Sequence, residues 1–205
     1  MRALDLFCGA GGASMGYHQA GFEVMGVDLH PQPRYPFEFH LADALTFPLE
    51  GFDFIHASPP CQDHVRAPGA MRKHGTGWIL GAIRERLLKS GALWVIENVP
   101  GAPLRPDFRL CGCMFGLRRL KRERWFEASW KPFILRPPCH HTERVISVTG
   151  TGTPTGTYKV YGSLPLSAFR EVMGIEWMTR KELSQAIPPA YAAFIGRHAK
   201  EIIDA

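Results

Sequence analysis

The sequence has no long hydrophobic run, and this limits the classes of protein to consider. No apolar segment reaches the roughly 18 residues that a membrane-spanning helix needs. The chain begins directly with a strand-like pattern, "RALDLF", so we expect no signal peptide. Internal repeats and low-complexity segments are also missing. We therefore expect a cytoplasmic protein without a membrane partner. Its 205 residues suit one domain, with room for a small appendage.

Cysteine is scarce. The chain has five cysteines, an odd number without the spacing of a disulfide framework, which favours reduced thiols. A zinc site is one interpretation of the group Cys111, Cys113, Cys139, His140 and His141. Its Cys-x-Cys element is tighter than the usual spacing of two residues. The alternative is packing and loop polarity, and from the sequence we assign no metal ligand.

Acidic residues are outnumbered, and the formal net charge is +5. This is modest support for a polyanionic partner such as a nucleic acid. The distribution says more than the total, because "RRLKRER" at 118–124 concentrates basic residues in the middle of the chain. A solvated face is the alternative interpretation of this run.

Apolar strand-like segments alternate with helical ones over the first hundred residues. The strand-like segments lie near 2–7, 23–28, 52–56 and 92–100, with a short one inside "FHLADAL"; the helical ones lie near 12–20 and 77–89. The pattern loosens after residue 100. Short helices return near the end, one opened by the capping box "TRKE" and one by "IPPAY". Near-continuous apolar strands alternating with helices predict an α/β fold, with a mostly parallel sheet covered on both faces.

In an open parallel sheet, ligands bind beyond the carboxyl ends of the strands. The glycine turn "FCGAGG" follows the first strand, and Asp28 ends the second. Glycines let backbone N–H groups approach a ligand, and an acid at the second position can accept bonds from ribose hydroxyls. Together they indicate an adenosine-containing cofactor, although a tight turn alone would also explain the glycines. Ser14 occupies the last position of a G-x-G-x-x-G pattern, which argues against NAD.

Two further residues carry possible chemistry. Cys61 follows Pro59 and Pro60 directly after a strand, where a thiol can act as a nucleophile rather than as an inert core residue. Glu97 lies near the end of the apolar strand "ALWVIENVP", and a buried carboxylate there is unfavourable unless it is paired. Adjacent strand ends would place the thiol and the carboxyl over the same crevice.

The order of these motifs resembles that of the cytosine-C5 DNA methyltransferases. The matching motifs are "DLFCGAGG", "VD", "AD", "SPPCQ", "ENVPG" and "RER", which cover most of residues 4–127; the last helix, "AIPPAYAAFIG", matches as well. The resemblance implies a Rossmann-like class I fold dependent on S-adenosylmethionine, plus a small irregular recognition region. It also implies double-stranded DNA as the substrate.

The resemblance further implies the roles of individual residues. S-adenosylmethionine would be bound by Phe7, Gly9, Ala10, Gly12, Asp28, Leu29, Asp43, Ala44 and Pro59. Asp28 would bind the ribose and Asp43 the adenine amino group. The catalytic residues would be Cys61, Glu97, Arg122 and Arg124. Cys61 would be the nucleophile, Glu97 would contact N3 and the exocyclic amine of cytosine, and Arg124 would lie near O2.

These roles explain why a thiol is needed. C5 of cytosine is too poor a nucleophile to attack a methyl group directly. Addition of a thiolate at C6 makes the ring enamine-like at C5, and a base removes the C5 proton after methyl transfer, which expels the thiol. The cytosine must leave the DNA helix to reach such a pocket.

The chain departs from the family pattern in three places, one of which is that "AIPPAY" stands where the family usually has a Gly-Asn pair before the last helix. Leu120 replaces the glutamine of the family's Gln-x-Arg-x-Arg motif. The segment between this motif and the final helices is short, so we expect a catalytic domain of residues 1–127 and 163–205 and a minimal target-recognition region at 128–162. So small a region leaves open an accessory specificity subunit. Two alternatives stay open as well: an RNA methyltransferase of the same fold, and an idle nucleic-acid-binding subunit, against which the intact catalytic set argues.

Overall fold

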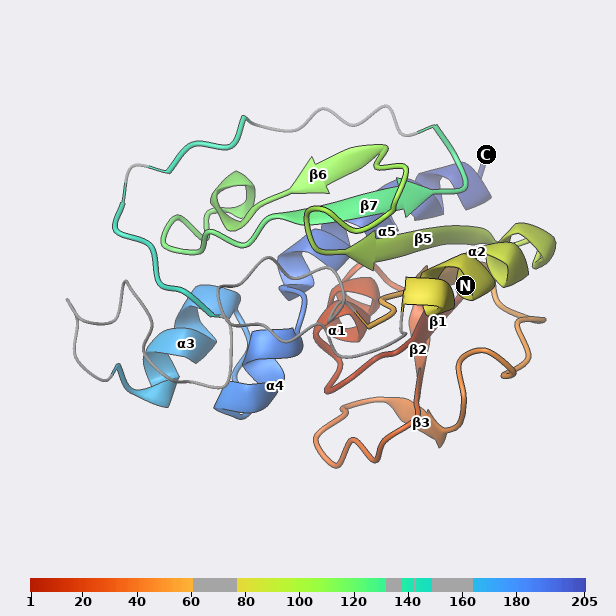
Figure 1. Ribbon diagram of the computed structural model, residues 1–205, viewed down its shortest axis with the longest axis horizontal. Helices are drawn as coiled ribbons and strands as arrows, with labels where there is room; N and C mark the ends of the chain where they lie inside the picture. Colours follow the sequence, from red (N-terminus) through yellow and green to blue (C-terminus); the bar gives the residue numbers. More distant parts are fainter. Residues whose placement is uncertain (61–76, 132–137, 142, 149–163) are drawn as a thin grey trace.

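The computed structural model describes residues 1–60, 77–131, 138–141, 143–148 and 164–205. Seven strands of this described part form one sheet, in the order β3-β2-β1-β4-β5-β7-β6 (Figure 1). The strands are β1 (Arg2–Leu6), β2 (Glu23–Asp28), β3 (Glu38–Leu41), β4 (Phe54–Ala57), β5 (Leu93–Asn98), β6 (Phe108–Leu110) and β7 (Arg124–Ala128). The helices are α1 (Gly12–Gln19), α2 (Gly77–Lys89), α3 (Leu166–Met173), α4 (Arg180–Gln185) and α5 (Pro189–Ile203), with a 3-10 turn η1 (Gly112–Phe115).

The first five strands pair in parallel, and among the seven strands only β7 runs in the opposite direction. β1 pairs with β2 and β4, β2 with β3, and β4 with β5, all in parallel. β7 runs antiparallel to both β5 and β6. The mostly parallel α/β fold predicted from the sequence is therefore confirmed. The antiparallel edge formed by β6 and β7 was not predicted, because these strands lie where the apolar pattern loosens.

Side-chain alternation along the strands divides the core into two layers. Ala3 of β1 and Phe54 of β4 pack on the side that α1 and α5 cover, together with Tyr17 and Ile195. Their neighbours in the sequence, such as Leu4, face the opposite side with Leu80, Ile83 and Leu87 of α2. Strands buried on both faces explain the near-continuous apolar runs of the sequence.

A third apolar cluster lies beside the sheet, around α3 and α4. Leu120, Ile146 and Val148 pack there against Phe169 and Met173. The N–H group of Ile146 also donates to the carbonyl oxygen of Arg119 at 2.7 Å. These contacts hold the described part of the expected recognition region against the turn that precedes β7. Residues 132–137, 142 and 149–162 of that region lie outside the described residues, so its domain boundary stays a prediction.

Among the described residues, none of the helices combines the length and the apolar character that crossing a membrane requires.

The packing of α1 on α5 requires glycine at position 16. A Cβ atom there would lie 2.2 Å from the carbonyl oxygen of Pro189 and 2.7 Å from the Cβ of Ala192. Overpacking at such a site typically lowers the free energy of unfolding by about 1–3 kcal/mol. We expect Gly16→Ala to do so, as measured by urea unfolding of the purified protein.

The matched control is Gly81→Ala in α2, where a Cβ would meet nothing within 4 Å. Alanine is the better helix former by about 1 kcal/mol, so this variant should be as stable as the parent chain or more stable. Equal stability of the two variants would show that α1 and α5 are not in close contact.

Candidate active site

The turn after β1 is held in an uncommon backbone conformation. Gly9 and Gly11 have φ values of 51° and 84°, and Phe7, which is not a glycine, has a φ of 62°. A non-glycine residue in this region is strained, and such strain is found at sites where a ligand binds. The N–H group of Gly9 donates to Oδ2 of Asp28 at 3.0 Å. The glycine turn is thereby fixed to the carboxyl end of β2.

Asp28 is oriented by two backbone donors. Its Oδ1 atom accepts a second hydrogen bond, 2.9 Å long, from the N–H group of His30. Each carboxylate oxygen has more than one lone pair, so both can accept a further bond from a ligand hydroxyl. The arrangement presents a fixed, pre-oriented acceptor at the end of β2.

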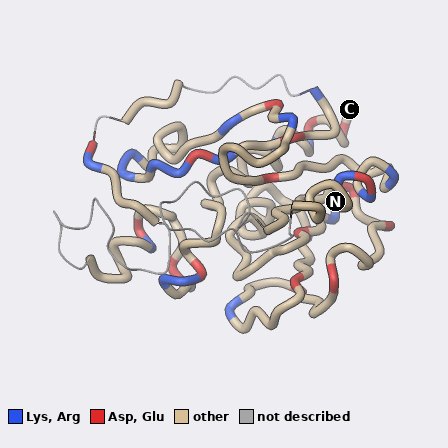
Figure 2. Tube along the Cα trace, in the orientation of Figure 1, with Lys and Arg blue, Asp and Glu red and all other residues tan. Residues whose placement is uncertain are grey.

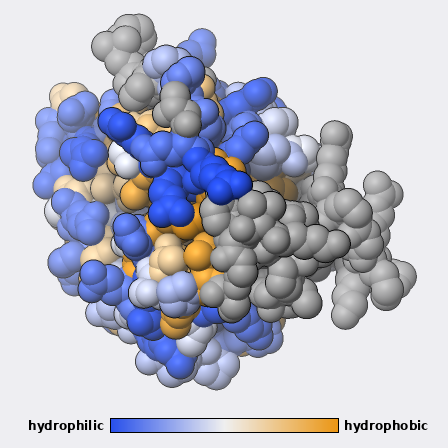
Figure 3. Space-filling model, turned by 90° about the vertical axis from the view of Figure 1, so that its left-hand side faces the viewer, coloured by the Kyte–Doolittle hydropathy of each residue, from blue (hydrophilic) through white to orange (hydrophobic). Residues whose placement is uncertain are grey.

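A cavity of about 630 Å³ opens beyond the carboxyl ends of the parallel strands. Figure 3 views the molecule from the side toward which β5 points, and shows apolar side chains at the centre of this face, bordered by hydrophilic ones. All the residues expected to bind the cofactor line this cavity: Phe7, Gly9, Ala10, Gly12, Asp28, Leu29, Asp43, Ala44 and Pro59. The structure thus brings together residues that the sequence spreads over more than fifty positions.

Gly12 also has a purely structural reason to lack a side chain. A Cβ atom there would lie 2.4 Å from the carbonyl oxygen of Ile187, in the segment that joins α4 to α5. This glycine therefore permits close packing of α1 at the wall of the cavity.

The cavity contains a buried ion pair. Glu97 of β5 is 6% exposed, and its Oε1 lies 2.8 Å from Nε of Arg124, the first residue of β7. Burial raises the pKa of the Glu97 carboxyl above its ordinary value, and attraction to Arg124 and Arg122 offsets only part of that increase. A carboxyl in this state can accept or donate a hydrogen bond to a polar ring that enters the cavity.

The proline turn after β4 is anchored from β5. The side-chain amide of Asn98 donates to the carbonyl oxygen of Pro59 at 3.0 Å, and Pro59 and Pro60 both line the cavity. Cys61, the next residue, lies outside the described residues. Its expected role as the nucleophile stays a prediction.

Arg122 makes a different set of contacts from Arg124. It is 3% exposed, is not among the residues that line the cavity, and donates to the carbonyl oxygens of Val148 at 2.6 Å and Ser184 at 2.8 Å. Its own carbonyl accepts a 2.7 Å hydrogen bond from the hydroxyl of Tyr191 in α5. We interpret Arg122 as a residue that positions the neighbouring segments, whereas the sequence motif suggested a catalytic role for it.

Basic residues lead into the site along the chain. Figure 2 shows the Lys and Arg positions of 118–124, interrupted by Leu120 and Glu123, along the backbone that leads to the start of β7. Arg124, at the end of this stretch, reaches the cavity. The basic run identified in the sequence is therefore continuous with the candidate site.

Sequence reasoning missed two groups of residues at the site. Helix α4 and the connection that follows it contribute Glu182, Ser184, Gln185, Ala186 and Ile187 to the cavity wall. A chain of buried polar groups also lies beneath Glu97: the Tyr17 hydroxyl and Ser58 Oγ each lie 2.7 Å from a ring nitrogen of His56. A hydrogen bond from Ser58 lowers the pKa of Glu97, so the chain reaches the ion pair. In the sequence, the one sign of this polar chain was His56, a histidine inside an otherwise apolar strand.

No protein-family model matches the chain, and a search of curated proteins finds no match. Solved structures do match. One from E. coli, described as a candidate DNA modification methyltransferase encoded within a prophage, gives a TM-score of 0.68 at 14% identity over 100% of both chains. The Dnmt2 methyltransferase of S. pombe gives 0.60 at 14% identity, over 98% of this chain and 99% of that one. The methyltransferase EhMeth of Entamoeba histolytica gives 0.61 at 10% identity over 98% of each.

The fold is that of the class I methyltransferases. At these levels of identity, the likeness establishes the arrangement of the chain and not its reaction. It agrees with the Rossmann-like architecture that the sequence motifs implied.

Asp5 offers a test of the buried polar groups beneath the cavity. It is 1% exposed and accepts a hydrogen bond from the Ser14 hydroxyl. Burial is the main cause that raises its pKa from 3.8 to about 7. The native state therefore binds this proton more tightly than the unfolded chain does. The resulting stabilisation is complete below about pH 4 and is lost as the pH rises through about 7.

We expect Asp5→Asn to remove this pH dependence, because the amide keeps an acceptor for Ser14 but never ionises. Its free energy of unfolding relative to the parent should increase between about pH 4 and 7, by roughly 2–4 kcal/mol in total. Urea unfolding at a series of pH values measures this. The exposed Glu85→Gln serves as the control, and equal pH profiles for Asp5→Asn and the parent would contradict the assignment.

Proposed function

We propose that the chain is an S-adenosylmethionine-dependent methyltransferase that methylates C5 of cytosine in double-stranded DNA. The observation that carries the proposal is the set of residues that line the 630 Å³ cavity. One part holds the glycine turn and two carboxylates, and another holds the Glu97–Arg124 pair beside Pro59 and Pro60. Methyl transfer to cytosine requires a cofactor site next to a site for the nucleobase.

The residues at the glycine turn suit an adenosine-type cofactor. Asp28 presents oriented acceptors for ribose hydroxyls. Asp43 follows β3, where its Oδ1 accepts a bond from the N–H group of Leu45 at 2.8 Å, and it provides an acceptor for an adenine amino group. S-adenosylmethionine has no pyrophosphate and so does not require the third glycine of the dinucleotide motif. Bound there, it would supply a methyl group on a positively charged sulfur.

The residues of the other part suit a cytosine ring. A Glu97 carboxyl with a raised pKa can donate a proton to N3 as charge develops there, while Arg124 can donate a hydrogen bond to the exocyclic carbonyl oxygen O2. A thiolate from Cys61 would form a bond to C6, and C5 would take the methyl group from the sulfonium. Loss of the C5 proton to a base then breaks the bond between sulfur and C6, which releases the thiolate, and the N3 proton returns to Glu97.

DNA is favoured as the substrate by the family resemblance of the motifs and by the description of the E. coli structure. The exposed basic residues of this stretch, Arg118, Arg119 and Lys121, would contact the phosphate backbone. An RNA substrate would use the same cavity, and a partner subunit could add sequence recognition to the short segment at 128–162. Incubation with labelled S-adenosylmethionine and either DNA or RNA of matched sequence separates these cases. Transfer to RNA alone would replace the proposed substrate, and transfer to neither would overturn the proposal.

Replacing Cys61 with alanine should abolish methyl transfer and leave cofactor binding unchanged. We also expect a covalent protein–DNA complex with DNA that carries 5-fluorocytosine, because fluorine cannot leave as a proton does. Denaturing gel electrophoresis detects this complex, and Cys61→Ala should not form it.

The matched control is Cys8→Ser, which alters a thiol that lines the cavity. Burial, together with the charges of Asp5 and Asp28, raises the pKa of the Cys8 thiol far above its ordinary range, so Cys8 is not a thiolate nucleophile. This variant should still trap the fluorinated DNA. Formation of the covalent complex by Cys61→Ala would remove Cys61 from the mechanism. The same conclusion would follow if only Cys8→Ser failed to form the complex.

Replacing Asp28 with alanine should weaken S-adenosylmethionine binding by about 1–3 kcal/mol, the range for losing a hydrogen bond to a charged group. Titration calorimetry measures the affinity, and a melting curve verifies that the variant is folded. Asp28→Asn retains acceptor capacity for one backbone donor and should lose less. Unchanged affinity in a folded Asp28→Ala protein would refute the ribose assignment.

A further inference from the structure

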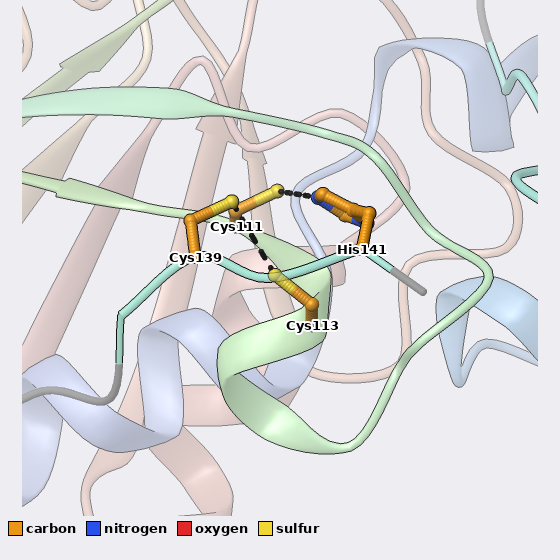
Figure 4. A group of neighbouring side chains, drawn as sticks. All are labelled: Cys111, Cys113, Cys139 and His141. Carbon is orange, nitrogen blue, oxygen red and sulfur yellow. Dashed lines mark hydrogen bonds between the residues drawn. The ribbon is translucent and has the colours of Figure 1, made fainter. Parts of the chain in front are cut away.

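Four soft donor groups meet at one place outside the cavity. Three cysteine thiols and one imidazole, from Cys111, Cys113, Cys139 and His141, have their ligand atoms all within 4.8 Å of one another. Figure 4 shows the four side chains converging on a common centre. None of them lines the candidate active site.

Their spacing fits a tetrahedral metal site. Sγ of Cys111 lies 3.3 Å from Nε2 of His141, and Sγ of Cys113 lies 3.4 Å from Sγ of Cys139. Zinc binds sulfur at about 2.3 Å and imidazole nitrogen at about 2.0 Å, so neighbouring ligand atoms of a zinc tetrahedron are roughly 3.5–3.8 Å apart. A small adjustment of the side chains would bring the atoms to this spacing.

The polypeptide around the first two cysteines is tightly folded. Cys111 follows β6 and is 2% exposed, and Cys113 lies in η1. A Cβ atom on the intervening Gly112 would lie 2.5 Å from the carbonyl oxygen of Leu120. This close turn directs both thiols toward the same point despite their tight spacing in the sequence.

The other two groups arrive from a distant part of the chain. Cys139 and His141 are alternate residues of a segment held nearby through the bridge between Leu120 and Ile146. The four groups therefore come from one Cys-x-Cys and one Cys-x-His element. His140 is exposed and is not one of the four. Packing alone would explain one buried thiol, but it does not require three thiols and an imidazole to converge.

We propose that Cys111, Cys113, Cys139 and Nε2 of His141 bind one Zn²⁺ ion. Three thiolates and a neutral imidazole form a closed set of four ligands, which is the composition of a structural rather than a catalytic zinc site. Binding releases the three thiol protons to solvent and forms four coordinate bonds. The ion would fix the segment at 138–148 to the turn that leads into Arg124.

Metal analysis of the purified chain, with any affinity tag removed, tests the proposal directly. Zinc measured by plasma mass spectrometry should be about one equivalent per chain. His141→Ala and the double variant Cys113→Ser/Cys139→Ser should lose most of it. His140→Ala, which alters the adjacent exposed histidine, should retain it. A zinc-free parent, retention of zinc by the double variant, or equal loss from both histidine variants would overturn the proposal.

Cobalt substitution provides a test that needs no variant. The unmodified chain reconstituted with Co²⁺ should show thiolate-to-metal charge-transfer bands and the intense visible absorption of tetrahedral cobalt. Absence of these bands would contradict a thiolate-rich site. The competing possibility is a disulfide between Cys113 and Cys139, which intact mass spectrometry would detect as a loss of two hydrogens. Such a disulfide would prevent metal binding and refute the proposal.

Discussion

The ion pair between Glu97 and Arg124 is the constraint on which the arrangement of the site depends. A carboxylate near the end of a buried strand is strongly disfavoured unless a cation reaches it. Glu97 lies opposite Phe126 in the antiparallel pairing of β5 with β7, and this register places Arg124 within 2.8 Å of it. A parallel neighbour would require a long crossover before it could return to this edge. The reversal of direction at β7 is therefore what allows a nearby basic segment to neutralise the acid.

Other buried polar groups near the site are likewise paired with partners from separate elements. Asp5 of β1 binds Ser14 of α1, which also accepts a bond from the Tyr35 hydroxyl, and His56 of β4 binds Tyr17 of α1. Burial lowers the pKa of His56 to about 3, so this imidazole stays neutral at physiological pH. The layer between the sheet and α1 thus contains hydrogen-bonded polar groups, of which His56 stays neutral and Asp5 ionises only as the pH rises through about 7.

Local sequence information was sufficient for the parts of the site that follow directly from a strand. Asp28 and Glu97 could be predicted because each ends an apolar run, and the ends of parallel strands share one edge. Arg122 could not be separated from Arg124 in this way. β7 begins at Arg124, so strand alternation does not extend to Arg122, and the contacts of Arg122 depend on segments 26 and 62 residues away. The cavity wall at Ile187 and the convergence of Cys111 with His141 depend equally on long-range packing.

The two carbonyl groups bound by Arg122 belong to parts of the chain with different surroundings. Val148 lies in the described part of the expected recognition region, whereas Ser184 lines the cavity. One planar guanidinium donates to both, and it is a rigid group. A displacement of either segment therefore breaks a buried hydrogen bond or moves the other segment with it. This side chain therefore sets one spacing between the expected recognition region and the wall of the cavity.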